Sequence, residues 1–279
     1  MIRMRFYLSL FLLLLAPLLS FAQGRDRGTF SFLYEPGARV EGGGRLTLGE
    51  SRLSTGLPPF RWDDNMLNVG FEWTHYDFRT EDTQPSNFDT DSVGLSLRWG
   101  FGDKKGWSGS VIFSPSLRSD FETVTTDDLG LSGLVLGSYP ARSNLTTVVG
   151  LVYSRSFGRD KLFPALGATW LPAHRWQVDL IFPRPRVTYQ ASEKARYHIG
   201  LEPGGDEWNI ELPEGSRDLS LEEYRAGGGA EWMLTRHVGL LAQAGAVFGR
   251  ELEVRDGRDK LYDYDIGDTW FARIGLLYR

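Results

Sequence analysis

The chain has 279 residues and a formal net charge of −5 at pH 7, and 41% of its residues are hydrophobic and 13% aromatic. An acidic chain lacks the basic surface that nucleic-acid binding requires, so no nucleic-acid partner is expected. It contains no cysteine, which excludes disulfides as a source of stability. The length fits one or two ordinary domains, or a single large β domain.

Residues 1–22 differ in composition from the rest. Two arginines precede an apolar run over residues 6–19, and small residues end it. This pattern predicts a secretory signal peptide that is cleaved before Gln23. An uncleaved membrane anchor is less favoured, because the run is short for a helical span and contains Pro17. We therefore expect an exported protein.

Residues 23–64 form a segment that is rich in glycine from residue 28 onward. Two interpretations stay open for it. It either adds a pair of strands to the sheet that the following residues predict, or lies as a non-strand plug inside or below that sheet.

From Asn65 onward the chain alternates between apolar and other residues in segments that turn residues separate. In the last segment, Trp270, Ile274 and Leu276 alternate with Phe271, Arg273, Gly275 and Leu277. Period two predicts β-strands. Because a soluble sandwich would alternate in the same way, the period alone does not decide between a sandwich and a barrel.

Two further features favour a membrane barrel. Aromatic residues stand near the ends of the apolar faces, as in the girdles of outer-membrane barrels: Trp73, Trp99, Trp107, Tyr153, Trp170, Trp176, Tyr189, Trp232, Trp270 and Tyr278. Short connections (102–106, 140–143, 172–175, 234–237) also alternate with long, mostly acidic ones (80–91, 119–128, 251–267). Outer-membrane barrels have short periplasmic turns and longer external loops.

Residues 65–279 are thus predicted to form an all-β, transmembrane antiparallel barrel of about 12 strands, within a range of about 10 to 14. This porin-like architecture implies the outer membrane of a Gram-negative cell. The count requires a turn within residues 203–206.

The segment 176–190 reads as one strand that is interrupted by Pro183 and Pro185. Proline cannot donate a ladder hydrogen bond, but a bulge tolerates it and shifts the alternation by one residue. A bulge at Pro183 would turn Asp179, Arg184 and Arg186 toward the lumen. Without it the two arginines would face lipid, at a cost of about 2–4 kcal/mol each near the membrane centre.

Three motifs carry a family resemblance: "FPALGATW" (163–170), "WQVDLIFPRPRVTY" (176–189) and "GGDEWNI" (204–210). They resemble a bacterial outer-membrane β-barrel family that is catalogued only as a domain of unknown function. The resemblance implies the barrel fold and the outer-membrane location, and it implies no activity or substrate. The partners expected for such a barrel are outer-membrane lipid, lipopolysaccharide and the barrel-assembly machinery.

The alternation places charges of both signs in the lumen: Glu72, Arg98, Asp179, Arg184, Arg186, Glu202, Glu207, Glu211, Arg225, Glu231 and Arg273. One interpretation, which we favour, is an interior packed with ion pairs. The other is a narrow pore with a charged constriction that selects small polar solutes. The leading hypothesis is a non-enzymatic barrel, either a narrow channel or a structural or surface protein.

Two other functions are weaker. A lipid-modifying enzyme of the phospholipase or deacylase type would place its site around His75 or His198, but neither has the His-x-Ser spacing. A soluble secreted sandwich or lipocalin-like binder is the third hypothesis. The aspartates of residues 256–268 fit no calcium loop, so no metal site is expected. Because the His-x-Ser spacing is missing, no catalytic residue is assigned either, and no cofactor is expected.

Overall fold

The computed structural model describes residues 28–82, 85–103, 106–154, 161–212, 215–257 and 259–279. The expected signal peptide lies outside the described residues. The strands are β1 (Gly28–Arg39), β2 (Arg45–Gly56), β3 (Phe60–Trp62), β4 (Asn65–Glu81), β5 (Phe88–Gly102), β6 (Ser108–Ser119), β7 (Leu129–Arg142), β8 (Leu145–Ser154), β9 (Lys161–Ala173), β10 (Trp176–Ile181), β11 (Arg186–Gln190), β12 (Ala195–Leu212), β13 (Gly215–Met233), β14 (Val238–Asp256), β15 (Asp259–Ile266) and β16 (Thr269–Tyr278).

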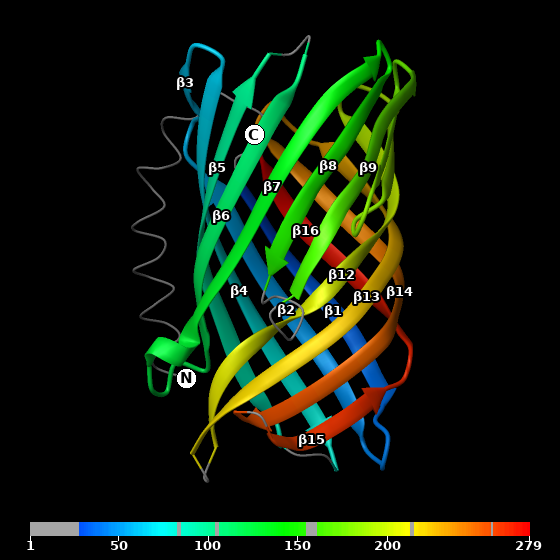
Figure 1. Ribbon diagram of the computed structural model, residues 1–279. Coiled ribbons are helices and arrows are strands. Elements are labelled where there is room, and N and C mark those ends of the chain that lie inside the picture. Colours follow the sequence, from blue (N-terminus) through cyan, green and yellow to red (C-terminus); the bar gives the residue numbers. More distant parts are fainter. Residues whose placement is uncertain (1–27, 83–84, 104–105, 155–160, 213–214, 258) are drawn as a thin grey trace.

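The strands form one antiparallel sheet that closes on itself (Figure 1). Neighbours along the sheet run from β13 through β12 and on to β4, β2, β1, β16 and β14, and β14 pairs back with β13. The ring thus contains about 14 strands, an even number, as bacterial outer-membrane barrels have. Within the described residues, no helix has the length and apolar character needed to cross a membrane.

The glycine-rich segment supplies strands. β1 pairs with β16 on one side and with β2 on the other, and β2 pairs with β4. Two interpretations were open for residues 23–64, and the described residues of this segment follow the first, since they add a pair of strands to the sheet. The first of these strands, β1, pairs with β16 and so joins the N-terminal and C-terminal parts of the barrel.

The bulge expected at Pro183 is wrong. β10 and β11 are two antiparallel strands, with Trp176 opposite Tyr189 and Asp179 opposite Arg186. The backbone N–H of Arg184 donates to the carbonyl of Ile181 at 2.9 Å and closes the turn between them. A proline has no N–H to continue the ladder, so the two prolines end the pairing here instead of bending one strand.

The turn expected within residues 203–206 is also wrong, because β12 continues through this segment. Gly205 has φ of +84°, a conformation that glycine adopts at little cost, and β12 stays paired with β13 on both sides of it. The two errors cancel in the strand count, since one turn was missed and one was added.

The long acidic connections are also mostly strand. β4 and β5 extend to residues 81 and 88, and β14 and β15 are joined at residues 257–258. The inward residues of these extensions, such as Leu252 and Val254, are apolar and buried. Burial of that apolar face stabilises the strands where they continue beyond the part of the barrel that spans the membrane.

The outer wall carries the apolar belt expected of a membrane barrel. Ile274 is 65% exposed and Leu240 44%. Aromatic rings pair at both ends of the belt: Tyr34 with Trp270 at a centroid distance of 6.3 Å toward one end, and Trp176 with Tyr189 at 4.7 Å at the other. An apolar band between two aromatic girdles is typical of transmembrane β-barrels.

The two ends of the barrel differ (Figure 1). At the short-turn end, which we define by the connections 143–144, 174–175 and 234–237, all ring strands are present and the C-terminus lies there. β8–β11 stop partway down, while β12–β15 continue to the opposite, long-strand end. There β12 meets β6 through a bridge between Asn209 and Ser119.

A buried cluster fills the interior of the long-strand end. It consists of Ala38, Val40, Leu46, Leu48, Tyr76, Phe78, Trp208, Ile210, Leu219, Leu221, Leu252, Val254 and Ile266. Trp208 packs edge-on against Tyr76 at a centroid distance of 4.8 Å and donates its indole N–H to the Ser92 hydroxyl at 3.1 Å. The interior is therefore closed by side-chain packing at this end.

Candidate functional site

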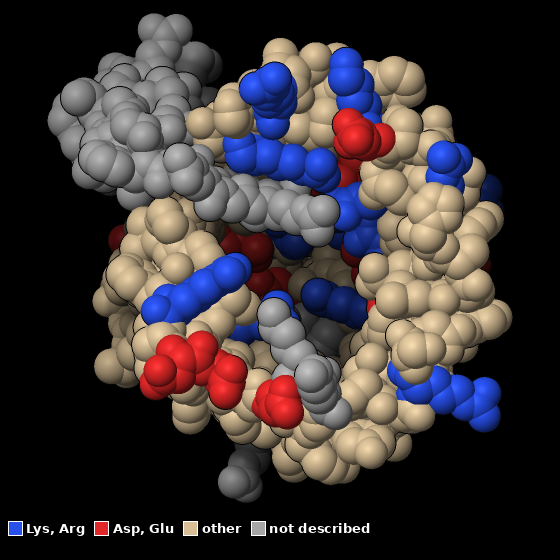
Figure 2. Space-filling view, turned by 90° about the horizontal axis from the view of Figure 1, so that it is seen from above, with Lys and Arg blue, Asp and Glu red and all other residues tan. Residues whose placement is uncertain are grey.

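A cavity of about 340 Å³ lies inside the barrel toward the short-turn end. We call it the vestibule. Figure 2 looks into the barrel from above and shows a hollow with basic and acidic residues on its wall. The vestibule is lined by Thr29, Arg184, Pro185, Arg186, Arg196, His198, Gly200, Leu201, Glu202, Glu231, Leu241, Gln243, Arg273 and Leu277.

Two of the predicted lumen arginines reach the vestibule from the turn between β10 and β11. Arg184 lies in that turn and Arg186 is the first residue of β11, opposite Gly200 of β12. Arg186 approaches Glu231 at 3.9 Å, and its side chain is 45% exposed. Asp179 lies opposite Arg186 and accepts a hydrogen bond of 2.7 Å from the hydroxyl of Thr169.

Glu231 is a second centre of charge on the vestibule wall. It is nearly buried and accepts from Arg196, whose Nε lies 3.0 Å away, and from Arg279 at 3.4 Å. Arg196 was not among the predicted residues. It shares the inward face of β12 with Glu202, which the alternation had found, so the sequence contained the signal for Arg196.

Arg273 lies at the floor of the vestibule. Its Nη1 donates to Glu202 and to the side-chain oxygen of Gln243, each at 3.1 Å. Its Nη2 lies 3.7 Å from Glu50, a buried residue that does not line the vestibule. Arg273 therefore links the open cavity to the buried residues beneath it.

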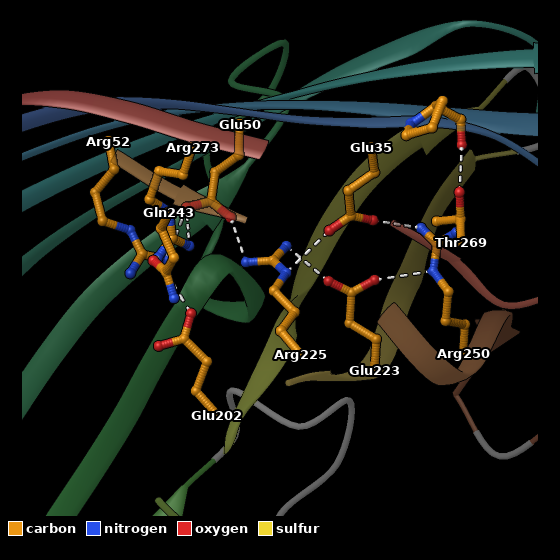
Figure 3. Close-up of polar contacts among 11 residues, drawn as sticks. Glu35, Glu50, Arg52, Glu202, Glu223, Arg225, Gln243, Arg250, Thr269 and Arg273 are labelled. Atoms are coloured by element: carbon orange, nitrogen blue, oxygen red, sulfur yellow. Dashed lines mark hydrogen bonds and ion pairs between the residues drawn. The ribbon is translucent and has the colours of Figure 1, made fainter. Parts of the chain in front are cut away.

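Those buried residues form an ion-pair layer (Figure 3), composed of Glu35, Glu50, Glu223, Arg225 and Arg250. Arg225 contacts three carboxylates, Glu35 and Glu50 at 2.9 Å each and Glu223 at 2.6 Å. Arg250 contacts Glu35 at 2.7 Å and Glu223 at 3.1 Å. Each of the five residues is at most 3% exposed.

The layer is balanced once its rim is included. Glu50 also lies 3.3 Å from Arg52, so four carboxylates (Glu35, Glu50, Glu202, Glu223) face four arginines (Arg52, Arg225, Arg250, Arg273). Charges survive burial when each has an opposite partner and hydrogen bonds. The layer therefore closes the lumen with polar groups between the open vestibule and the apolar cluster.

Most of this layer was missed by the alternation. Glu35 and Glu50 lie in the glycine-rich segment, where no face was assigned. Arg250 follows Gly249, whose φ of +60° breaks the regular alternation of β14. The inward residue is Val247 before this glycine and Arg250 after it.

The remaining predicted lumen residues do not line the vestibule. Arg98 is exposed and donates to the Ser110 hydroxyl at 3.3 Å, and Glu72 is exposed next to buried Thr74 on β4. Glu207 does not face the vestibule. It precedes Trp208, which is in the core, and neighbouring strand residues point to opposite faces.

Glu207 instead lines a small cavity of about 20 Å³ beside Arg118 and Asp128. Glu211 follows Ile210 of the core in the same way and lies at the long-strand end, where its backbone N–H donates to Asp120 at 2.7 Å. Both placements in the lumen were wrong, because they depended on the turn within residues 203–206 that β12 does not have.

The two candidate histidines lie in different surroundings. His75 contacts Asp91 at 3.2 Å and stacks on Trp73, whereas its neighbours Thr74 and Tyr76 are the buried residues of β4. His198 lines the vestibule. Among the described residues, neither histidine hydrogen-bonds a serine hydroxyl.

Among the described residues, one acidic group has its carboxylates close enough together to hold a cation: Glu251, Glu253 and Asp263. The ammonium of Lys260 already lies among them, in contact with Glu253, 2.7 Å from Asp263 and 3.9 Å from Glu251. This lysine occupies the position that a metal ion would take.

Several solved structures are similar to this chain. An outer-membrane channel from Pseudomonas putida F1 is 10% identical and has a TM-score of 0.48, and the match covers 93% of this chain and 97% of that chain. The translocator domain of the autotransporter NalP from Neisseria meningitidis is 13% identical, with a TM-score of 0.42 and coverage of 97% and 94%. The KdgM porin is 8% identical, with a TM-score of 0.41 and coverage of 90% and 98%. Similarities at this level do not assign a function.

No curated protein is significantly similar to the chain. A family model does match, that of the domain of unknown function DUF6268, over residues 71–279. This range extends from within β4 to the end of the chain and includes the three motifs. The chain is therefore a transmembrane β-barrel that belongs to the DUF6268 family.

Proposed function

We propose that this protein is a narrow outer-membrane channel, entered by small polar solutes at the short-turn end and closed in the present conformation by the ion-pair layer and by the apolar cluster beyond it. The observation that carries this proposal is the position of an open, charged cavity directly above a fully buried, charged layer, with Arg273 in contact with both.

The chemistry of the two closures favours a channel over a structural barrel. Replacing a buried ion-pair network by apolar residues is often neutral or stabilising. The long-strand end of this same interior is closed by apolar packing. A barrel that needed only stability could use such packing throughout, so the charges are better explained by the passage of polar solutes.

The layer also joins separate strands. Glu35 comes from β1, Glu50 from β2, Arg225 from β13 and Arg250 from β14. Opening a path through the layer requires that these contacts part. Residue changes that weaken the contacts without leaving a fully buried arginine unpaired should favour the open state.

Glu50→Gln is the appropriate variant for a conductance test. It keeps the shape of the side chain, leaves Arg225 paired with Glu35 and Glu223, and leaves Arg273 paired with Glu202. Arg52 also loses the charge of Glu50, but its side chain is 37% exposed. In planar bilayers, the wild-type chain should give brief, infrequent openings and the variant longer or more frequent ones. Glu122→Gln, a change of the same charge at an exposed position of the long-strand end, should behave as wild type. Silence of both wild type and Glu50→Gln, with insertion verified by heat-modifiable gel migration, would refute the channel.

The proposed orientation places the short-turn end and the C-terminus in the periplasm, as in other outer-membrane barrels. It implies export by the signal peptide, cleavage before Gln23, insertion by the barrel-assembly machinery, and contact of the apolar belt with outer-membrane lipid and lipopolysaccharide. N-terminal sequencing of the protein from isolated outer membranes tests the cleavage site.

The proposed channel is non-enzymatic. Recovery of lipase or deacylase activity from the folded wild type, and its loss in His75→Ala or His198→Ala, would establish the enzyme instead. Recovery of the mature protein from the soluble periplasmic fraction would favour a soluble binder.

A further inference from the structure

The vestibule holds more positive than negative charge. Four arginines line it (Arg184, Arg186, Arg196, Arg273), against two carboxylates (Glu202, Glu231). Two of these arginines have close partners, since Arg196 binds Glu231 at 3.0 Å and Arg273 binds Glu202 at 3.1 Å. The positive excess therefore resides on the other two.

Arg184 and Arg186 are the two vestibule arginines for which no hydrogen bond to a described carboxylate is formed. Within the described part of the chain, no ion pair is formed by Arg184, and the contact of Arg186 with Glu231 is long, at 3.9 Å. Glu231 is already shared by Arg196 and Arg279. Two guanidinium groups in this position repel each other and their neighbours unless an anion lies between them.

The backbone fixes where the two side chains start. Pro183 and Pro185 have restricted φ angles, so the turn that carries both arginines is stiff. Pro185 favours an extended backbone at residue 184, and Cα atoms two residues apart in extended chain are separated by roughly 7 Å. The two side chains therefore start about that far apart. Two carboxylates at the ends of a short carbon chain match that separation better than one compact anion does.

The size of the cavity limits the ligand. Ligand sites in proteins commonly have volumes of about 300–1,000 Å³, and the vestibule, at about 340 Å³, lies at the lower end. Arginine guanidinium groups bind planar carboxylates through two parallel hydrogen bonds. We propose that the vestibule binds small organic dicarboxylates, with Arg184 and Arg186 each holding one carboxylate.

This inference deepens the proposed function, because it names the class of solute, but its test requires no conductance. The refolded chain in detergent is titrated calorimetrically with succinate, with the uncharged succinamide and with inorganic phosphate. The variant is Arg184→Gln/Arg186→Gln. The control is Arg98→Gln, which removes one positive charge, from an arginine that hydrogen-bonds Ser110 and does not line the vestibule.

Wild type should bind succinate and not succinamide. Each substitution removes charge-assisted hydrogen bonds, so the double variant should bind succinate about 100-fold or more weakly, whereas Arg98→Gln should stay near wild type. Equal binding by wild type and the double variant, or absence of saturable succinate binding, would overturn the site. Tighter binding of phosphate than of succinate would overturn the dicarboxylate assignment. Heat-modifiable migration verifies that each variant is folded.

The two proposals fail separately. Arginine-dependent succinate binding by a protein that never conducts would retain the site and reject the channel. Conductance that neither succinate nor the two substitutions alter would retain the channel and reject the site.

Discussion

Replacing Arg225 by methionine should destabilise the barrel more than any other single removal of a charge. Arg225 is the only described residue in direct contact with three buried carboxylates, those of Glu35, Glu50 and Glu223. Methionine fills a similar volume without the charge. The substitution therefore leaves three buried carboxylates with fewer partners and creates little empty space.

The magnitude follows from these contacts. A hydrogen bond to a charged group contributes about 1.5–3 kcal/mol, and Arg225 forms two of them, with Glu35 and Glu50, together with an ion pair to Glu223. The carboxylates are not left alone, because Arg250 still binds Glu35 and Glu223, and Arg273 still approaches Glu50. The expected cost is therefore about 3–5 kcal/mol, the range for removing one member of a buried ion pair.

The assay is equilibrium folding into lipid vesicles over a urea series, followed by tryptophan fluorescence and by heat-modifiable migration. Arg98→Met is the matched control, since Arg98 is exposed and forms one hydrogen bond of 3.3 Å. Its cost should stay within about 0.5 kcal/mol. If Arg225→Met and Arg98→Met were equally stable, the layer would not hold the strands together and the reasoning would be refuted.

Three further predictions concern the wall. Ile274→Arg should cost about 2–4 kcal/mol of folding free energy in bilayers, because Ile274 faces lipid, and Ile274→Val should be nearly neutral; equal stability of the two would place this face away from lipid. Gly205→Ala should lower the free energy of unfolding by at least about 2 kcal/mol, since φ is +84° and the new Cβ would lie 1.9 Å from the Leu221 carbonyl oxygen. Gly106→Ala is the control, because a Cβ there would have nothing within 4 Å. Cysteine at position 180 should react with a lipid-soluble reagent and cysteine at 186 with a water-soluble one, because Leu180 is an exposed apolar residue and Arg186 lines the vestibule; the reverse pattern would contradict the register of β10 and β11.

The transmembrane wall could be predicted from the sequence, because one physical rule governs it. Lipid outside and water or protein inside impose period two on every strand, so the outward placement of Trp270 and Ile274 followed directly. The same alternation is present in β1, where Phe30 and Phe32 are exposed and Leu33 is buried. It went unassigned because glycine dominates the segment around it.

The layer and the solute site could not be predicted to the same extent, because they depend on local departures from period two. Gly249 shifts Arg250 inward, and Gly205 lets β12 continue where a turn was expected. The prolines of β10–β11 end a strand instead of bulging it. The contact of Glu50 with Arg225 joins residues 175 positions apart, and no pattern within a strand can indicate such a pairing.

The most direct test of the account is side-specific labelling, since the chain contains no native cysteine. Thr29 lines the vestibule, Leu221 lies in the core beyond the ion-pair layer, and Glu122 is exposed at the long-strand end. In oriented vesicles, a membrane-impermeant maleimide should label Thr29→Cys only from the short-turn side and Glu122→Cys only from the other, and it should label Leu221→Cys from neither. Labelling of Thr29→Cys at equal rates from both sides would contradict the account, because the lumen would then be continuous through the layer.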